Sequence, residues 1–332
     1  MFKGFNIKLP VYSVVCPQSG YLFDTRSLTV AELNYVKTSL TVPAKAYSII
    51  NKALWDTISD KPDFINNYEE FKKNVTMKDR EALIYASYVA TFGEDREFST
   101  QCTTCGSENE LNINIPGCFS MNAYPGSNSI ISSYNVSKAI DKEEFDPEIE
   151  NEMNKRGRNK KNKVKPEIGT PGIPDIAFVD EEDSISVDEA PEENNLNNIL
   201  NKRLKIELPI SKIIAIIKQP TIFDEEYIMK SIPFSQKKSL DAISETLIID
   251  KFEEYDQNNG ALKQVVDNRE DILFAFQSLP PRDKMKMFDE YSENFGKYGI
   301  ELKQDFNCKE CGATNSLEID IFNQFFRLVR EY

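Results

Sequence analysis

The chain of 332 residues contains no histidine. This absence excludes Ser-His and Cys-His triads, histidine general bases and histidine metal ligands. Any bound zinc must therefore be held by cysteine thiolates or, less favourably, by carboxylates. The sequence also has no glycine-rich phosphate loop. Because histidine chemistry is excluded, neither an enzyme nor a small-molecule substrate is expected.

Long apolar runs are also missing. No segment of about 18 apolar residues occurs, so no transmembrane helix is expected. The first ten residues lack the apolar stretch and cleavage site of a signal peptide. We therefore expect a cytoplasmic chain, where thiols stay reduced and paired cysteines indicate metal binding rather than disulfides.

Basic residues are fewer than acidic ones, with 40 Lys and Arg against 54 Asp and Glu and a net charge of -14. This balance argues against broad binding to nucleic acid phosphates. The 40% hydrophobic content, with 21 Phe and 14 Tyr, is that of a globular protein. The length suggests about two domains of roughly 150 residues.

The middle of the chain differs from its two ends. Residues 154–165 hold seven Lys or Arg and no acid, and residues 175–193 hold nine Asp or Glu and no base. Such charge blocks cannot bury enough apolar surface to offset the entropy lost on ordering. We therefore predict an N-terminal half at 1–135, a charged and flexible insertion at 136–200, and a C-terminal half at 201–332. The insertion is either a solvated tether or a docking strip for an oppositely charged partner.

The sequence pattern predicts an α+β fold for both halves, with helices and short antiparallel strands. A Thr29-x-x-Glu32 capping box predicts a helix from about Val30, and a similar start at Thr76 predicts another that ends at Phe92-Gly93. Alternating residues predict strands at 111–115 and 204–208, and an apolar run predicts a buried strand at 213–217.

The end of each half repeats the same pattern. Each has a helix with an acid near its start (Asp79, Asp283), a Phe-Gly stop, a short strand, a CxxCG knuckle and an alternating strand. Beyond the knuckle, six positions keep one offset: Cys102, Cys105, Gly106, Leu111, Ile113 and Ile115 correspond to Cys308, Cys311, Gly312, Leu317, Ile319 and Ile321. We interpret the two segments as copies of one helix–strand–knuckle–strand unit. The two acids complement the helix dipole and are not expected to be catalytic.

The two knuckles supply Cys102, Cys105, Cys308 and Cys311. A CxxC turn directs two thiolates at one metal, and the following glycine accommodates a positive φ. Because each pair provides half of a four-cysteine set, the two knuckles are predicted to share one structural Zn²⁺ in a zinc-ribbon-like site. The metal could be shared within one chain or across two. Alternatives are two separate sites, completed by Cys16, Cys118 or carboxylates, and knuckles without metal.

Two other interpretations concern the remaining cysteines and the C-terminal segment. Cys16 and Cys118 stand alone in apolar surroundings, which favours small core residues over ligands. The C-terminal segment is too aromatic for a free tail and should dock against this chain or another. Its candidate partner-binding residues are Phe322, Phe325, Phe326 and Leu328.

The order of these motifs resembles a known family. The Thr76-Met-Lys-Asp79-Arg80 helix start, the Phe92-Gly93 stop and the first knuckle are followed by Leu279-Pro-Pro-Arg-Asp283, the second knuckle and Phe325-Phe326. This series is similar to the baseplate hub proteins of contractile-tailed bacteriophages of the T-even type. It covers about 1–120 and 200–332, and the charged insertion departs from it.

The resemblance implies a zinc-containing subunit or assembly factor of the central hub, where the tail tube, the spike and the wedges meet. Such a protein binds other tail proteins, has no catalytic residues, is made in the host cytoplasm and resides in the virion baseplate. The sequence leaves open whether it stays in the particle or acts as a transient chaperone.

Two rival functions remain. One is a zinc-ribbon accessory factor for transcription or replication that contacts nucleic acid through the 155–165 basic run. The other is a metal-dependent hydrolase, which would require an open coordination position on the metal.

Overall fold

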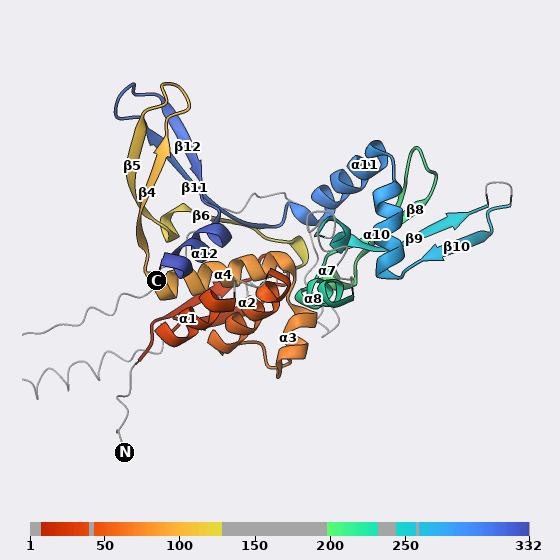
Figure 1. The fold of residues 1–332 in the computed structure, drawn as a ribbon, viewed down its shortest axis with the longest axis horizontal. Coiled ribbons are helices and arrows are strands. Elements are labelled where there is room, and N and C mark those ends of the chain that lie inside the picture. The colour runs from red at the N-terminus through yellow and green to blue at the C-terminus, as the bar shows by residue number, and fades with distance from the viewer. Residues whose placement is uncertain (1–7, 40–42, 128–197, 232–243, 257–258, 332) are drawn as a thin grey trace, which may run out of the picture.

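The computed structural model describes residues 8–39, 43–127, 198–231, 244–256 and 259–331. Most of the predicted 136–200 insertion, with its 155–165 basic run, lies outside the described residues. The described part is a mixture of helices and antiparallel strands, which confirms the predicted α+β class (Figure 1).

The N-terminal half begins with the hairpin β1 (Val11–Val15) and β2 (Leu22–Arg26), and the short strand β3 (Ile58–Asp60) pairs with the other edge of β2. Its helices are α1 (Val30–Ser39), α2 (Pro43–Thr57), α3 (Tyr68–Asn74) and α4 (Met77–Phe92). A second hairpin follows, β4 (Asp95–Gln101) and β5 (Glu108–Asn114). The chain then passes through η1 (Pro116–Cys118), β6 (Phe119–Asn122) and η2 (Pro125–Ser127).

The C-terminal half starts at α7 (Asn198–Asn201) and continues with the strands β7 (Arg203–Glu207), β8 (Ile214–Lys218), β9 (Ile249–Tyr255) and β10 (Leu262–Val266), which form a sheet in the order β10-β9-β8-β7. Its helical segments are α8 (Ile222–Ser231), η4 (Thr246–Ile248), α10 (Arg269–Ser278), α11 (Pro281–Tyr291) and the π-helical turn η5 (Ser292–Gly296). The hairpin β11 (Gly299–Asn307) and β12 (Thr314–Glu318) precedes the final helix α12 (Ile321–Glu331).

The two halves repeat the same path from their first strand onward. One offset, 192 residues, separates Val11 from Arg203 at the start of β1 and β7, Leu22 from Ile214 at β2 and β8, and Val30 from Ile222 at α1 and α8. The helix starts are built alike as well. The hydroxyls of Thr29 and Thr221 each accept the backbone N–H of the acid three residues later at 3.3 Å. The duplication is therefore wider than the sequence pattern around the knuckles predicted.

An equivalent ion pair lies at each of these helix starts. Arg26 contacts Glu32 at 2.6 Å in the first half, and Lys218 contacts Asp224 at 2.6 Å in the second. Arg26 and Lys218 occupy equivalent positions at the ends of β2 and β8. Each cation thus joins the hairpin to the capping acid of the next helix.

The acids predicted to complement the helix dipoles have a more specific role. Asp79, on α4, accepts the backbone N–H of Gln18 at 2.8 Å in the β1–β2 turn. Asp283, on α11, accepts those of Ile210 and Ser211 at 2.8 and 2.9 Å in the β7–β8 turn. Both side chains are completely buried, so each acid fixes a hairpin turn to the helix that packs beneath it.

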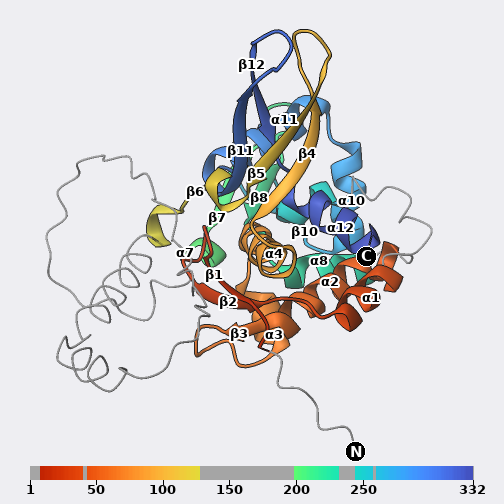
Figure 2. The same ribbon diagram turned by 90° about the vertical axis from the view of Figure 1, so that its left-hand side faces the viewer.

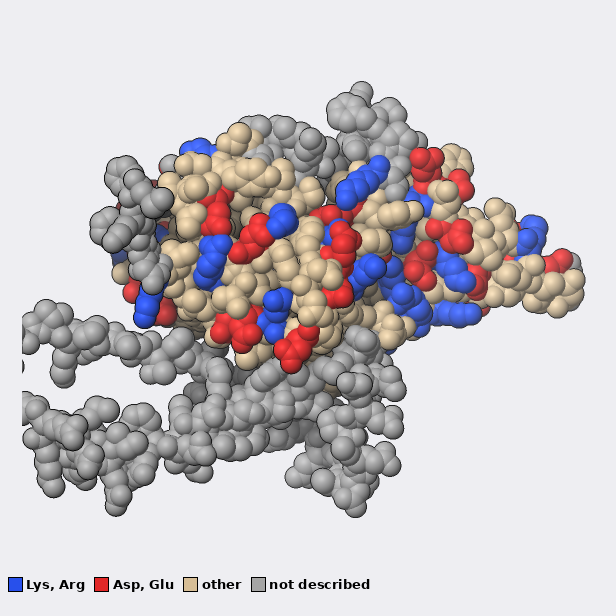
Figure 3. All heavy atoms as spheres, turned by 90° about the horizontal axis from the view of Figure 1, so that it is seen from below, with Lys and Arg blue, Asp and Glu red and all other residues tan. Residues whose placement is uncertain are grey.

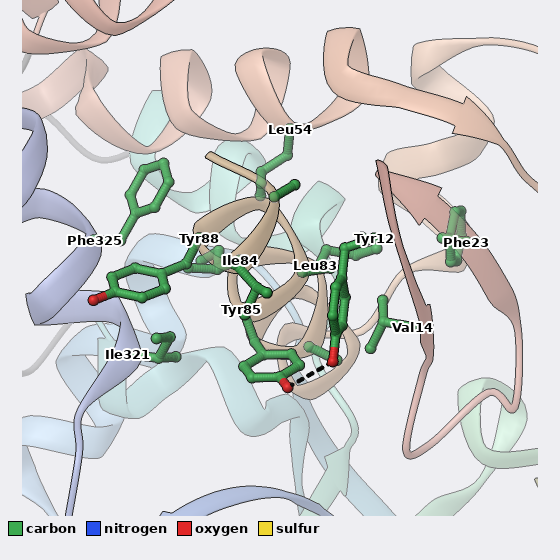
Figure 4. Packing of buried hydrophobic residues seen from close by; sticks show 14 of the residues in the cluster. Tyr12, Val14, Phe23, Leu54, Leu83, Ile84, Tyr85, Tyr88, Ile321 and Phe325 are labelled. Atoms are coloured by element: carbon green, nitrogen blue, oxygen red, sulfur yellow. Dashed lines mark hydrogen bonds between the residues drawn. The ribbon is translucent and has the colours of Figure 1, made fainter. Parts of the chain in front are cut away.

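Helix α4 lies at the centre of the larger core. Thr76 caps its N-terminus and Gly93 ends it with a φ of 87°, as the sequence predicted. Leu83 and Ile84 pack among side chains of β1, β2 and α2, and the hydroxyls of Tyr12 and Tyr85 lie 3.1 Å apart (Figure 4). Helix α12 covers another side of α4, so the end of the chain belongs to the core of the first half.

The position of α12 against the core explains why this helix is rich in aromatic residues. Phe325 and Phe326 are only 3% and 7% exposed, and Phe322 and Leu328 are partly buried against the same core. The structure thus places the two most buried candidate partner-binding residues inside the fold. The C-terminal segment docks against its own chain.

A buried ionic cluster joins α8 to the first half. Arg80 donates to Glu225 at 2.5 Å, and Lys72 contacts Glu226 at 3.4 Å, with all four side chains at most 7% exposed. Next to it, the backbone N–H of Met77 bonds Pro220 O at 3.0 Å. The two halves are therefore held together by packing and by ion pairs.

The surface carries both signs of charge. On the face shown in Figure 3, Lys and Arg side chains alternate with Asp and Glu, and no broad region of one sign is visible. Among the described residues, no helix has both the length and the apolar character needed to cross a lipid bilayer.

Candidate metal centre

The four knuckle cysteines come together at the tips of two hairpins. The β4–β5 and β11–β12 hairpins stand side by side and project from the helical body (Figures 1 and 2). Their strands pair in equivalent registers, with Gln101 opposite Glu108 and Asn307 opposite Thr314. The predicted pair of knuckle units is therefore confirmed.

The sulfur atoms form one compact group. The Sγ atoms of Cys102, Cys105, Cys308 and Cys311 all lie within 4.8 Å of one another. The Sγ atoms of Cys102 and Cys311 are 3.7 Å apart, as are those of Cys105 and Cys308. A disulfide requires about 2.05 Å between sulfurs, so these cysteines are free thiols.

The spacing suits a tetrahedral metal. Four thiolates at about 2.3 Å from a zinc ion place neighbouring sulfurs roughly 3.8 Å apart. The two cross-knuckle distances of 3.7 Å agree with that figure. The four cysteines can therefore hold one metal ion between the two halves of the chain.

Each knuckle turn is closed by an equivalent backbone hydrogen bond. The N–H of Gly106 bonds Cys102 O, and that of Gly312 bonds Cys308 O, both at 2.9 Å. The two glycines have φ values of 74° and 72°, in the left-handed region that favours glycine. This turn explains why glycine follows both CxxC pairs.

Hydrogen-bond donors around the sulfurs favour the thiolate form. Backbone N–H groups of Cys105 and Thr104, together with the side chain of Asn315, lower the pKa of Cys102. The Ser107 hydroxyl, backbone N–H groups at 311 and 310 and the side chain of Asn109 lower the pKa of Cys308 to about 5. Such donors stabilise negative sulfur.

The fourth thiol shows the opposite shift. The backbone N–H of Ala313 lowers the pKa of Cys311, but the adjoining sulfurs, with Cys105 the largest contributor, raise it to about 12. Like charges at this spacing oppose the ionisation of all four thiols. A divalent cation at the centre would remove that opposition.

The other two cysteines stay apart from this group. Cys16 is completely buried beside α4, with its Sγ 3.9 Å from Asp79 O. The Sγ of Cys118 donates to Asn114 O at 3.3 Å. Among the residues that the structure describes, neither belongs to a group of potential metal ligands.

The sequence interpretation missed two asparagines in the site. Asn109 and Asn315 follow the first cysteine of each knuckle by the same seven positions, and both are buried between the hairpins, 1% and 6% exposed. The pair lies in the register of the knuckle repeat, so the alignment of the two segments already contained this signal.

Comparison with known proteins gave no match, whether with protein-family models, curated proteins or solved structures. The function must therefore be inferred from the chain itself, from its fold and from the cysteine geometry.

Proposed function

We propose that this chain is a structural or assembly protein in which one zinc ion joins two duplicated halves. The observation that carries the proposal is the convergence of four sulfurs, two from each hairpin, within 4.8 Å. Zinc is the common structural metal for four thiolates in a tetrahedral arrangement.

The ligand set favours a structural role over a catalytic one. Four thiolates fill a tetrahedral site, whereas a catalytic zinc keeps one position open for water or substrate. No histidine exists in the chain to replace a thiolate. A metal held in this way contributes to folding and not to Lewis-acid chemistry, so we do not propose a hydrolase.

We further propose that the assembly in question is a phage tail baseplate hub, with other tail proteins as partners. The support is the resemblance carried by the ordered motifs from Thr76 to Phe326. The projecting hairpins add to it, because a rigid metal-bound tip extending from the body is a shape suited to contacts with another protein. The two sides of this tip come from different repeats, so the metal keeps them in one arrangement.

The partner proposal is tested by recovering the tagged chain from cells that assemble phage tails, followed by mass spectrometry of the particles and of assembly intermediates. We expect tail proteins to co-purify with the chain, and the Cys308→Ser variant to recover fewer of them. Presence in finished particles identifies a permanent subunit, whereas presence in intermediates alone identifies a chaperone.

Retention on DNA at physiological salt, lost when the 155–165 run is neutralised and accompanied by no tail protein, would replace the proposal with the nucleic acid accessory factor.

A further inference from the structure

Two buried asparagines link the knuckles in a reciprocal manner. Asn109 lies on β5 and Asn315 on β12, at equivalent positions of the two hairpins. Buried carboxamides need hydrogen-bond partners for both their oxygen and their NH₂ group. In both cases these partners include the knuckle of the other hairpin.

Asn315 contacts the first knuckle. Its Oδ1 accepts the backbone N–H of Thr103 at 2.9 Å and the Thr103 hydroxyl at 2.8 Å. Its Nδ2 donates to Ala313 O at 2.8 Å and to the Sγ of Cys102 at 3.4 Å. All the polar atoms of this side chain are thereby satisfied.

Asn109 makes the matching contacts with the second knuckle. Its Oδ1 accepts the backbone N–H of Lys309 at 3.0 Å. Its Nδ2 donates to Ser107 O at 3.1 Å and to the Sγ of Cys308 at 3.7 Å. The residues contacted here, Ser107, Cys308 and Lys309, are the repeat equivalents of Ala313, Cys102 and Thr103.

We infer that Asn109 and Asn315 are positioning residues of the metal centre, each orienting the first cysteine of the opposite knuckle. An N–H directed at a thiolate fixes the direction of the sulfur and offsets part of its charge. The inference rests on the proposed metal site and extends it: neither hairpin is complete without a side chain from the other.

The chemistry of this position calls for an amide. The oxygen must accept a backbone N–H across the hairpin interface, while the nitrogen must donate toward sulfur. A carboxylate keeps the first interaction and loses the second, and it adds a negative charge beside a thiolate. Asn→Asp is therefore an isosteric change that separates the positioning role from simple filling of space.

The experiment compares Asn109→Asp and Asn315→Asp in the full-length chain with Asn112→Asp, an exposed control on the same strand as Asn109. Zinc affinity is measured by competition with a chromophoric chelator. The sulfur-to-metal charge-transfer band is recorded after loading with cobalt(II). We expect affinity about 10- to 100-fold weaker in each buried variant, a shifted cobalt band, and wild-type behaviour in the control.

Failure of the positioning role and failure of the metal site give different results. Wild-type affinity and an unshifted cobalt band in both buried variants would overturn the inference and leave the proposed metal site intact. An equal loss in Asn112→Asp would also overturn it, because added charge alone would then explain the effect. A wild-type chain that binds no metal would instead refute the proposed site itself. Should the Asp variants fail to fold, Asn109→Ser and Asn315→Ser provide the same readouts under the same criteria.

Discussion

The two repeats share the turn of the first hairpin, the Thr cap of the helix that follows it and the knuckle, yet the helices that precede the two knuckles have very different surroundings. In the first repeat, α4 has eleven buried residues. Its counterpart α11 has two, Asp283 and Met287. Helix α4 is covered by β1, β2 and α2 and, in addition, by α12, which follows the second knuckle but packs on the first repeat. Among the described elements, α11 contacts mainly β8 and η5.

This comparison separates what a local sequence determines from what packing determines. Strand limits, capping boxes and knuckle turns are local, and they recur in both copies. Burial of the helix that precedes the knuckle depends on which other elements cover it, and within the described part of the chain α12 packs on α4 of the first copy. The first repeat should therefore contain most of the stability of the protein.

The largest expected effect comes from removing the cover of α4. Phe325 is 3% exposed and lies against Phe92 and Phe326. Phe325→Ala should reduce the free energy of unfolding by about 3–5 kcal/mol, because it leaves a cavity in the larger core. Phe274→Ala is the matched control, since Phe274 on α10 is 74% exposed. Urea denaturation measures the free energy of unfolding of both variants. A loss in Phe325→Ala as small as the one at the exposed control would show that α12 contributes little to that core.

A second prediction concerns the paired acids Asp79 and Asp283. Burial raises the pKa of Asp79 to about 6 against the hydrogen bonds it accepts. Burial also raises that of Asp283, but the N–H groups of Ile210 and Ser211 outweigh it and leave the pKa below its ordinary value. The two equivalent acids should thus affect stability in opposite directions as pH changes.

The direction in which stability changes with pH depends on whether the folded or the unfolded chain binds the proton more tightly. The contribution of Asp79 is present below the unfolded pKa of 3.8 and is lost as pH rises through about 6. Relative to wild type, Asp79→Asn should therefore gain on the order of 2 kcal/mol between pH 4 and pH 7. Asp283→Asn should instead lose stability as pH rises from 3 to 5. Urea unfolding of the metal-free protein at several pH values tests this, and parallel pH profiles for the two variants would contradict it.

The helix caps should respond equally in the two repeats. Thr29→Ala and Thr221→Ala each remove a hydroxyl that accepts a backbone N–H at the start of α1 or α8. Each substitution should cost about 1 kcal/mol of unfolding free energy. A clear loss at only one position, measured by thermal unfolding, would mean that the caps are equivalent in geometry alone.

The smallest effect is expected in the hairpin turns. Gly20 and Lys212 occupy equivalent positions with φ values of 73° and 60°, and a side chain in this region is strained. Lys212→Gly should raise stability by about 0.5–1 kcal/mol, and Gly20→Ala should lower it by a similar amount. A destabilised Lys212→Gly protein would indicate that the Lys212 side chain makes contacts that outweigh the strain.

Much of the fold could be predicted where the signal was local. The helices from Val30 and Thr76, the Phe92-Gly93 stop and the alternating strands at the knuckles follow from caps, turns and periodicity. The four candidate metal ligands could be named as well, because two CxxC pairs in a chain without histidine leave few other donors. The repeated CxxCG indicated that the two pairs belong together.

Other features depended on contacts between distant segments. The repeat of β1–β2–α1 in β7–β8–α8 could not be predicted because equivalent positions carry similar rather than identical residues. Val14 corresponds to Ile206, and Arg26 corresponds to Lys218. The attachment of α12 to α4 involves apolar side chains that suit many partners. The role of Asn109 and Asn315 could not be predicted because an asparagine within an alternating strand resembles any other polar position.

The measurement that tests the central claim most directly is the metal content of the purified full-length chain, determined by elemental analysis and native mass spectrometry. The shared site predicts one zinc per chain in a monomer, and its complete loss in both Cys102→Ser and Cys308→Ser. Hydrogen exchange should then rise at both hairpin tips, while the amides of α4 remain protected by the core. Two zinc ions per chain, or a Cys308→Ser protein that retains its zinc, would contradict the account.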